Sequence, residues 1–217
     1  MIDKKLLLAF VIVVSIATPS AFAHKLLAVS PENTMKEIAI PIPDPSRQSW
    51  FTLEEFERQG QSHWYSFVGK AGDQILIQTM VPSIEHSRNF TPSFDLLIGD
   101  GKVIAQPVVK NYFEPYSKTN WIVKAELEIT LPSDGTYYIR AHDELHHYSV
   151  GDVGKFALGI GDKESFSFIE NLMVPIWILQ VNMFFGNAIF VWMVLVIVLI
   201  LSIILLVLIA NREKKSN

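Results

Sequence analysis

The sequence predicts a mainly β protein, an antiparallel β-sandwich of jelly-roll-like type, set between apolar segments at the two ends of the chain. Short runs rich in β-branched and aromatic residues alternate with Gly, Pro and Asp turn signals between residues 50 and 161. No long helical pattern separates these runs. The terminal segments leave about 140 to 160 of the 217 residues for soluble structure, which is one domain of ordinary size.

The first 23 residues have the three parts of a secretory signal peptide. Lys4 and Lys5 form a positive start, and the apolar run Leu6–Ala17 is too short to span a bilayer. An Ala-Phe-Ala tripeptide at residues 21–23 is a cleavage site of the small-residue type. We therefore predict a signal peptide at residues 1–23, whose removal makes His24 the mature N-terminus. The alternative is an uncleaved anchor helix.

The C-terminal end has the pattern of a single transmembrane helix. Residues 188–210 are uncharged and almost wholly apolar. A helix of this length is roughly 35 Å long, enough for a hydrocarbon core of about 30 Å. The tail at residues 211–217 is basic, and cations directly after a span mark the cytoplasmic side. The sequence thus predicts a single-pass type I protein of the cell membrane, with its N-terminal domain outside and one helix in contact with the lipid bilayer.

A second helical pattern precedes the predicted span. Apolar residues recur at spacings of three and four, and polar residues fill other positions; the apolar set is Ile169, Leu172, Ile176, Leu179 and Met183. We predict an interfacial amphipathic helix at residues 166–187, lying at the outer membrane surface. The alternative is a second transmembrane helix, which would place the basic tail outside and contradict the charge rule.

The predicted sandwich covers residues 50–165 and follows an N-terminal extension at residues 24–49. Its expected strands are 64–68, 74–81, 94–98, 103–105, 126–131, 136–142 and 155–160, separated by turn signals such as Gly99-Asp100-Gly101-Lys102. On the strand after Gly135, Tyr137 and Ile139 alternate with Tyr138, and we expect the first two to face the core.

Four segments carry a resemblance to a known domain. The run GQSHWYSFVGKAGDQILIQTMVP, the strand and turn FDLLIGDGK, the strand LPSDGTYYI and the closing strand GKFAL resemble the pre-peptidase C-terminal type domain over roughly residues 60 to 160. The wider layout is similar to prokaryotic single-span membrane proteins that carry an Ile-Pro-Asp-Pro-Ser/Thr stretch, here residues 42–46, and a Phe-Glu-Pro-Tyr/Phe stretch, here residues 113–116. The resemblance implies a β-sandwich used as a binding or accessory module and implies no activity.

Charge and composition exclude several classes of function. Residues 24–186 carry 13 Lys and Arg against 20 Asp and Glu, a net charge of −7. This balance argues against nucleic acid as a partner, because phosphate neutralisation needs clustered cations. The chain has no cysteine, so disulfides and thiolate metal sites are excluded.

Histidines supply the candidate metal ligands. His142, His146 and His147 lie close together in the sequence HDELHHY, where they could form a surface site for copper or zinc or simply a solvated loop. His24 could chelate Cu(II) through its amine and imidazole after signal cleavage. Four aspartates, Asp73, Asp95, Asp100 and Asp134, are expected to cap turns in preference to binding Ca²⁺.

The sequence contains no G-x-S-x-G, H-E-x-x-H or Gly-rich phosphate motif, so we do not expect an enzyme. The leading hypothesis is a membrane-anchored extracytoplasmic binding or accessory module that contacts a partner protein, a glycan or another envelope component and needs no cofactor. The alternative is a copper-binding envelope protein, or an accessory subunit of a membrane metalloenzyme, that uses His24.

Overall fold

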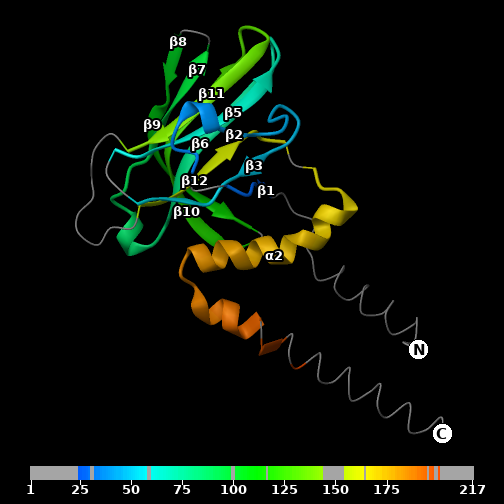
Figure 1. Cartoon of the computed structure of the whole chain (residues 1–217). Coiled ribbons are helices and arrows are strands. Elements are labelled where there is room, and N and C mark those ends of the chain that lie inside the picture. The colour runs from blue at the N-terminus through cyan, green and yellow to red at the C-terminus, as the bar shows by residue number, and fades with distance from the viewer. Residues whose placement is uncertain are drawn as a thin grey trace, which may run out of the picture. The chain divides into compact units, whose positions relative to one another are not determined.

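The computed structural model describes residues 24–29, 32–57, 60–98, 101–115, 117–143, 154–163, 165–194, 196–197 and 200 (Figure 1). The chain divides into two compact units. One comprises residues 21–166 and holds all the strands that the structure describes, and the other contains the helix α2. The predicted signal peptide at residues 1–23 and the basic tail at residues 211–217 lie outside the described residues.

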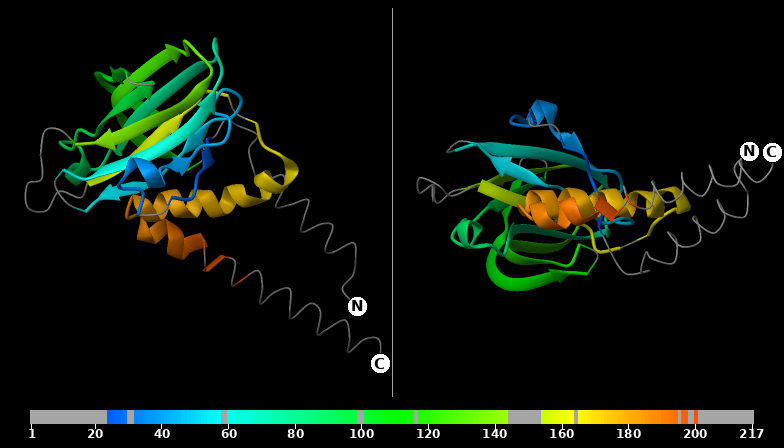
Figure 2. Two further views of the ribbon diagram at one scale, coloured as in Figure 1. Left: turned by 45° about the horizontal axis from the view of Figure 1, so that its top comes forward. Right: turned by 90° about the horizontal axis from the view of Figure 1, so that it is seen from below.

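Two sheets form the first unit, as a β-sandwich requires (Figures 1 and 2). Sheet A contains, in spatial order, β1 (Lys25–Leu26), β3 (Trp50–Phe51), β12 (Gly154–Ile160), β6 (Gln74–Pro82), β10 (Thr119–Thr130) and β9 (Gln106–Glu114), and β4 (Glu54–Phe56) pairs with β12. Sheet B contains β2 (Ile40–Pro41), β5 (Ser62–Gly69), β11 (Gly135–His142), β7 (Ser93–Ile98) and β8 (Gly101–Ile104). Two short 3-10 helices, η1 (Lys36–Ile38) and η2 (Glu85–Ser87), lie between strands. The prediction of a mainly β sandwich is confirmed.

Residues 24–49, predicted as an extension ahead of the sandwich, supply strands to both sheets. β1 pairs with β3 and β2 pairs with β5, and both pairings are parallel. The backbone N–H of Ile42 donates to the carbonyl of Ser66 at 2.7 Å, and the Ile42 side chain is buried in the core. The segment therefore completes both sheets, and the sandwich is antiparallel except at these two short pairings.

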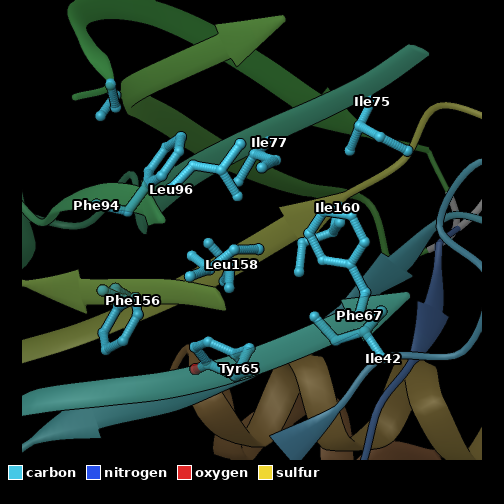
Figure 3. Close-up of a cluster of buried hydrophobic side chains, with 14 of the residues drawn as sticks. Ile42, Tyr65, Phe67, Ile75, Ile77, Phe94, Leu96, Phe156, Leu158 and Ile160 are labelled. Atoms are coloured by element: carbon cyan, nitrogen blue, oxygen red, sulfur yellow. The ribbon is translucent and has the colours of Figure 1, made fainter. Parts of the chain in front are cut away.

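Alternation along the strands builds the core between the sheets. Tyr65 and Phe67 of β5 point toward the same layer as Ile75 and Ile77 of β6, and Figure 3 shows this cluster with Phe94, Leu96, Phe156, Leu158 and Ile160. Tyr137 and Ile139 of β11 are also fully buried. The predicted register of β11 is thus confirmed.

The sequence pattern gave no sign of β9, the outermost strand of sheet A. β9 pairs along one side with β10, with a register shift opposite residues 123 to 125. Most residues of β9 are exposed, and apolar and polar residues do not alternate along its sequence. An edge strand of this kind lacks the periodicity that reveals a half-buried strand. Only its hydrogen bonds to β10 define it.

The helix α2 (Phe168–Phe184) is the main element of the second unit. Ser167 and Glu170 form a reciprocal capping box at its N-terminus. From Met173 to Leu179 every residue is apolar, so the middle of α2 is apolar on all sides and does not present a single stripe. The predicted helix exists, but polar positions are confined to its ends. Its location at a membrane surface stays a prediction.

Within the described part of the chain, no helix is both long enough and apolar enough to cross a bilayer. The predicted transmembrane helix at residues 188–210 is described only up to residue 200, with gaps, and residues 188–194 are helical. The remainder of that predicted span lies outside the described residues.

Candidate ligand-binding face

The outward side of sheet B gathers aromatic and charged residues. Since side chains alternate between the two sides of a strand, the neighbours of the core residues point outward. Trp64 on β5, Arg140 on β11 and Asp95 on β7 are direct cross-strand partners. The next row contains Ser66, Tyr138, Leu97 and Lys102. We call this surface, defined by these seven residues, the outer face of sheet B.

Asp95 lies at the centre of this face beneath three side chains. Arg140 Nη2 lies 2.5 Å and Arg140 Nε 3.1 Å from Asp95 Oδ2. Lys102 Nζ lies 3.0 Å from Asp95 Oδ1, and His142 Nε2 lies 3.4 Å from Asp95 Oδ2. The Asp95 side chain is 1% exposed, whereas that of Arg140 is 34% exposed and that of Lys102 is 43% exposed. One buried carboxylate thus holds two solvent-accessible cations.

The carboxylate of Asp95 is kept ionised by its neighbours. Burial by itself acts to raise the pKa of Asp95, because it removes the charged form from water. The contacts with Lys102 and Arg140, together with the charge of His142, outweigh burial and hold the pKa of Asp95 below its usual value. The charge of Asp95 therefore persists at neutral pH, and both cations stay fixed to it.

The guanidinium of Arg140 is only partly engaged. Its Nε and Nη2 form one edge, and this edge faces Asp95. Among the described residues, Asp95 is the sole acceptor for Arg140 and the sole anionic partner of Lys102. The edge formed by Nη1 and Nη2 has the fork geometry that matches a carboxylate or phosphate. Arg140 can therefore bind a second anion without releasing the first.

Two half-buried aromatic rings flank this charge cluster. Trp64 stands beside Arg140, and Tyr138 lies one row further along β11. Lys36 of η1 places its Nζ 4.4 Å from the centre of the Tyr138 ring. Cations are attracted to the negative face of such rings. The outer face of sheet B thus combines ring faces with fixed positive charge.

His24 lies at the start of β1, on sheet A. Its Nδ1 contacts the hydroxyl of Ser49, and its ring stacks on Phe51 with 5.9 Å between ring centroids. The ring of Tyr112 lies 6.5 Å away. Desolvation of the His24 ring lowers its pKa from 6.5 to about 4, because removal from water disfavours the charged form. A copper chelate formed with the α-amine would use the same Nδ1 atom of His24 that contacts the Ser49 hydroxyl.

The other predicted metal ligands are not brought to His24. His142 lies at the end of β11, on sheet B, beside Asp95. His146 and His147 lie outside the described residues. Among the side chains that the structure describes, no three His, Cys, Asp or Glu residues converge as ligands for a metal ion. Copper binding stays a prediction. Of its candidate ligands, His24 lies at the start of β1 on sheet A and His142 lies on sheet B.

His63, a further histidine on β5, lies between the sheets. Its Nδ1 contacts the buried carboxylate of Glu54, and its ring meets Phe56 and Phe156 edge-on. Gln61 Nε2 lies 3.0 Å from His63 Nε2. Both ring nitrogens therefore have protein neighbours. Glu54 and His63 form a structural pair in the core.

The predicted turn caps are confirmed at two of the four aspartates. Asp73 accepts a hydrogen bond from the backbone N–H of Lys70 at 2.9 Å, and Asp134 accepts one from Ala71 at 2.8 Å. Asp100 lies outside the described residues. Asp95 caps no turn, and the prediction for it is wrong because its neighbours across the sheet are Arg140 and Lys102.

No protein-family model and no curated protein sequence matches the chain. Solved structures similar to it include a pre-peptidase C-terminal domain of collagenase from Bacillus anthracis, at 14% identity and a TM-score of 0.36, covering 61% of this chain and 99% of that one. PliG, a periplasmic inhibitor of g-type lysozyme from Aeromonas hydrophila, matches at 15% identity and a TM-score of 0.35, covering 64% and 98%. PliG from Salmonella Typhimurium matches at 14% identity and a TM-score of 0.33, covering 57% and 96%. These likenesses concern the arrangement of strands, and no residue role is carried over from them.

Sequence reasoning did not single out Arg140 or Lys102. A weak signal existed, because Arg140 interrupts an otherwise apolar and aromatic strand at a position that alternation places outward. The partner strands, however, are more than 30 residues away in the chain, since Asp95 and Arg140 are separated by 45 positions. Only the pairing of β7 with β11 reveals the cluster.

Proposed function

We propose that this protein is a non-catalytic binding module of the cell envelope that recognises a ligand through the outer face of sheet B. The observation that carries the proposal is the buried carboxylate of Asp95, which holds Arg140 and Lys102 at solvent-accessible positions. A charge removed from water is costly unless it is paired. A sheet surface whose only requirement was solubility would not need a buried, paired carboxylate such as Asp95.

The predicted terminal segments complete this proposal. Signal cleavage after Ala23 would deliver the sandwich outside the cytoplasm, and the apolar residues 188–210 would hold it at the membrane. The ligand would then be a component of the same envelope or a molecule that reaches it.

The binding test uses the full chain in detergent micelles and isolated envelope material from the organism that produces it. We expect the wild-type chain to cosediment with this material and Arg140→Gln to cosediment much less. Arg47→Gln is the matched control, because Arg47 also pairs with an aspartate but lies on an exposed loop outside sheet B. Equal loss in both variants, or loss in neither, would remove the outer face of sheet B as the binding surface.

The topology test uses protease added to spheroplasts. We expect the domain at residues 24–165 to be digested and an epitope tag on the tail at residues 211–217 to be protected. A protected domain would contradict extracytoplasmic exposure while leaving the binding result intact.

A second candidate is contact with a protein partner along β9. Val109 is 82% exposed and Phe113 is 55% exposed, on the outermost strand of sheet A. An exposed sheet edge can accept a strand from another chain, and exposed apolar side chains favour a protein partner. Replacing Val109 by Lys should abolish such a contact in a crosslinking assay, whereas Lys110→Gln should preserve it.

A further inference from the structure

We propose that the ligand of the outer face of sheet B is a glycan that carries carboxylate groups. This inference rests on the proposed binding function and names the chemistry of its ligand. Arg140 is the first group that would bind such a carboxylate, because its Nε and Nη2 are held by Asp95 while no described residue accepts a hydrogen bond from its Nη1. A carboxylate fits the Nη1–Nη2 edge with two parallel hydrogen bonds.

Lys102 supplies a second cation at the same carboxylate. Lys102 Nζ contacts Oδ1 of Asp95, whereas Arg140 Nη2 contacts Oδ2. The two cations therefore contact the two oxygens of one buried anion, and these contacts hold them in place. A ligand carboxylate that binds between them needs little ordering of protein side chains, and such preorganisation increases affinity.

The rings and hydroxyls of this face favour a sugar over a peptide. Trp64 is half-buried, and its ring face carries partial negative charge that can pack against polarised C–H bonds. The Tyr138 ring has Lys36 Nζ 4.4 Å from its centre, so it adds a further cation to this face. Hydroxyl groups surround the cluster on the same face; they belong to Ser62, Ser66, Ser93 and Thr136. Each hydroxyl can both donate and accept a hydrogen bond, as the hydroxyls of a sugar require.

The same face carries few large aliphatic side chains. Among the described side chains of the sheet B strands, Val68 is the single large aliphatic one that is exposed. Protein interfaces enrich Trp, Tyr and Arg at a dry centre, but Lys, Asp and Glu are depleted there. On sheet B the charged groups lie at the centre. A polar, anionic polymer fits this arrangement better.

The experiment measures binding of three probes to the full chain in detergent by isothermal titration calorimetry. The probes are an oligogalacturonate, its methyl ester and poly-L-glutamate of equal chain length. We expect the oligogalacturonate to bind, the methyl ester to bind much less, and poly-L-glutamate to bind weakly. Arg140→Gln should lower the affinity for the oligogalacturonate by about tenfold or more, which is typical of a lost charge-assisted pair. Arg140→Lys should fall between, because it keeps the charge and loses the fork.

Lys102→Gln gives a second variant in case Arg140→Gln does not fold, and Arg47→Gln is the control with unchanged affinity. Equal binding of the methyl ester would overturn carboxylate recognition. Equal or tighter binding of poly-L-glutamate would overturn the assignment to a glycan. If neither anionic probe binds but envelope binding still depends on Arg140, the glycan inference fails and the proposed binding function stands. If envelope binding is also independent of Arg140, both fail.

Discussion

Nδ1 of His63 contacts the carboxylate of Glu54 in the space between the two sheets. The tautomer of His63 follows from Gln61, whose Oε1 accepts the backbone N–H of Glu57 at 2.8 Å, so that its Nε2 donates to Nε2 of His63. His63 Nε2 is then the acceptor and Nδ1 carries the proton. Asn33 adds a contact of 3.5 Å from Nδ2 to the same oxygen of Glu54. This chain of contacts joins the N-terminal segment, β4 and β5.

Replacing one member of this pair should destabilise the protein more than replacing both. His63→Leu leaves the buried carboxylate of Glu54 without its main partner and should cost about 3 to 5 kcal/mol. Glu54→Leu removes an acceptor and should cost about 1 to 3 kcal/mol. The double variant should be clearly more stable than the sum of the two single losses predicts, because Phe56 and Phe156 provide apolar surroundings.

Denaturant unfolding of the full chain in detergent measures the stability of all three variants. The exposed neighbour Glu55→Gln is the control and should change stability by less than about 0.5 kcal/mol. Additive losses would mean that the two side chains do not form a pair.

The Asp95 cluster should weaken in acid. The pKa of Asp95 is depressed in the folded state, so its contribution is fully present above the unfolded pKa of about 4 and is lost as the pH falls through the lower folded value. Asp95→Asn should lose about 1 to 3 kcal/mol at pH 7, and its stability should depend less on pH below about 4. Unfolding between pH 7 and 2 tests this against the exposed-site control Asp44→Asn. A variant that retains the full acid dependence would show that other carboxylates cause it.

His24 should make the sandwich less stable between neutral and mildly acid pH. Its folded pKa of about 4 lies below the ordinary value of 6.5, so the unfolded chain binds the proton first. Stability is therefore fully present above about pH 6.5 and falls as the pH drops toward 4. His24→Phe keeps a ring against Phe51 and should flatten this dependence, whereas Ser49→Ala should leave it in place. An unchanged pH profile in His24→Phe would contradict the assignment.

Ile139 tests the packing of the core. Ile139→Ala should cost about 2 to 5 kcal/mol, because it removes buried methyl groups and leaves a cavity among well-packed neighbours. Thr136 lies on the same strand and is exposed, so Thr136→Ala should change stability by less than about 0.5 kcal/mol. Thermal unfolding compares the two variants. A similar loss in both would place the register of β11 in error.

Copper binding through His24 is tested after signal cleavage. The α-amine and imidazole of His24 would chelate Cu(II) once Nδ1 leaves Ser49, so Ser49→Ala should tighten binding. A competitive titration compares the mature chain, a form with an extra N-terminal Gly, and a triple Ala variant at His142, His146 and His147. The extra Gly should abolish tight binding. A mature chain that binds no better than a free His-Lys-Leu peptide would exclude a built copper site.

The sequence by itself determined the β-sandwich class, most of the central strands and the inward-facing positions of β11. These features are local, because turn residues and the alternation of apolar side chains are written along single segments. The predicted signal peptide and membrane span are equally local patterns. β9 escaped prediction because an edge strand with two exposed sides has no such alternation.

Only the tertiary structure decided which charged residues meet. Asp95 and Arg140 become neighbours through the pairing of β7 with β11, and Glu54 meets His63 because β4 reaches β5 across the core. The N-terminal segment joined both sheets for the same reason, since its strands of two residues carry too little pattern to be seen alone. Register between distant strands depends on the burial of whole faces, which no single segment encodes. The candidate binding face is therefore a property of the fold, although each of its residues is visible in the sequence.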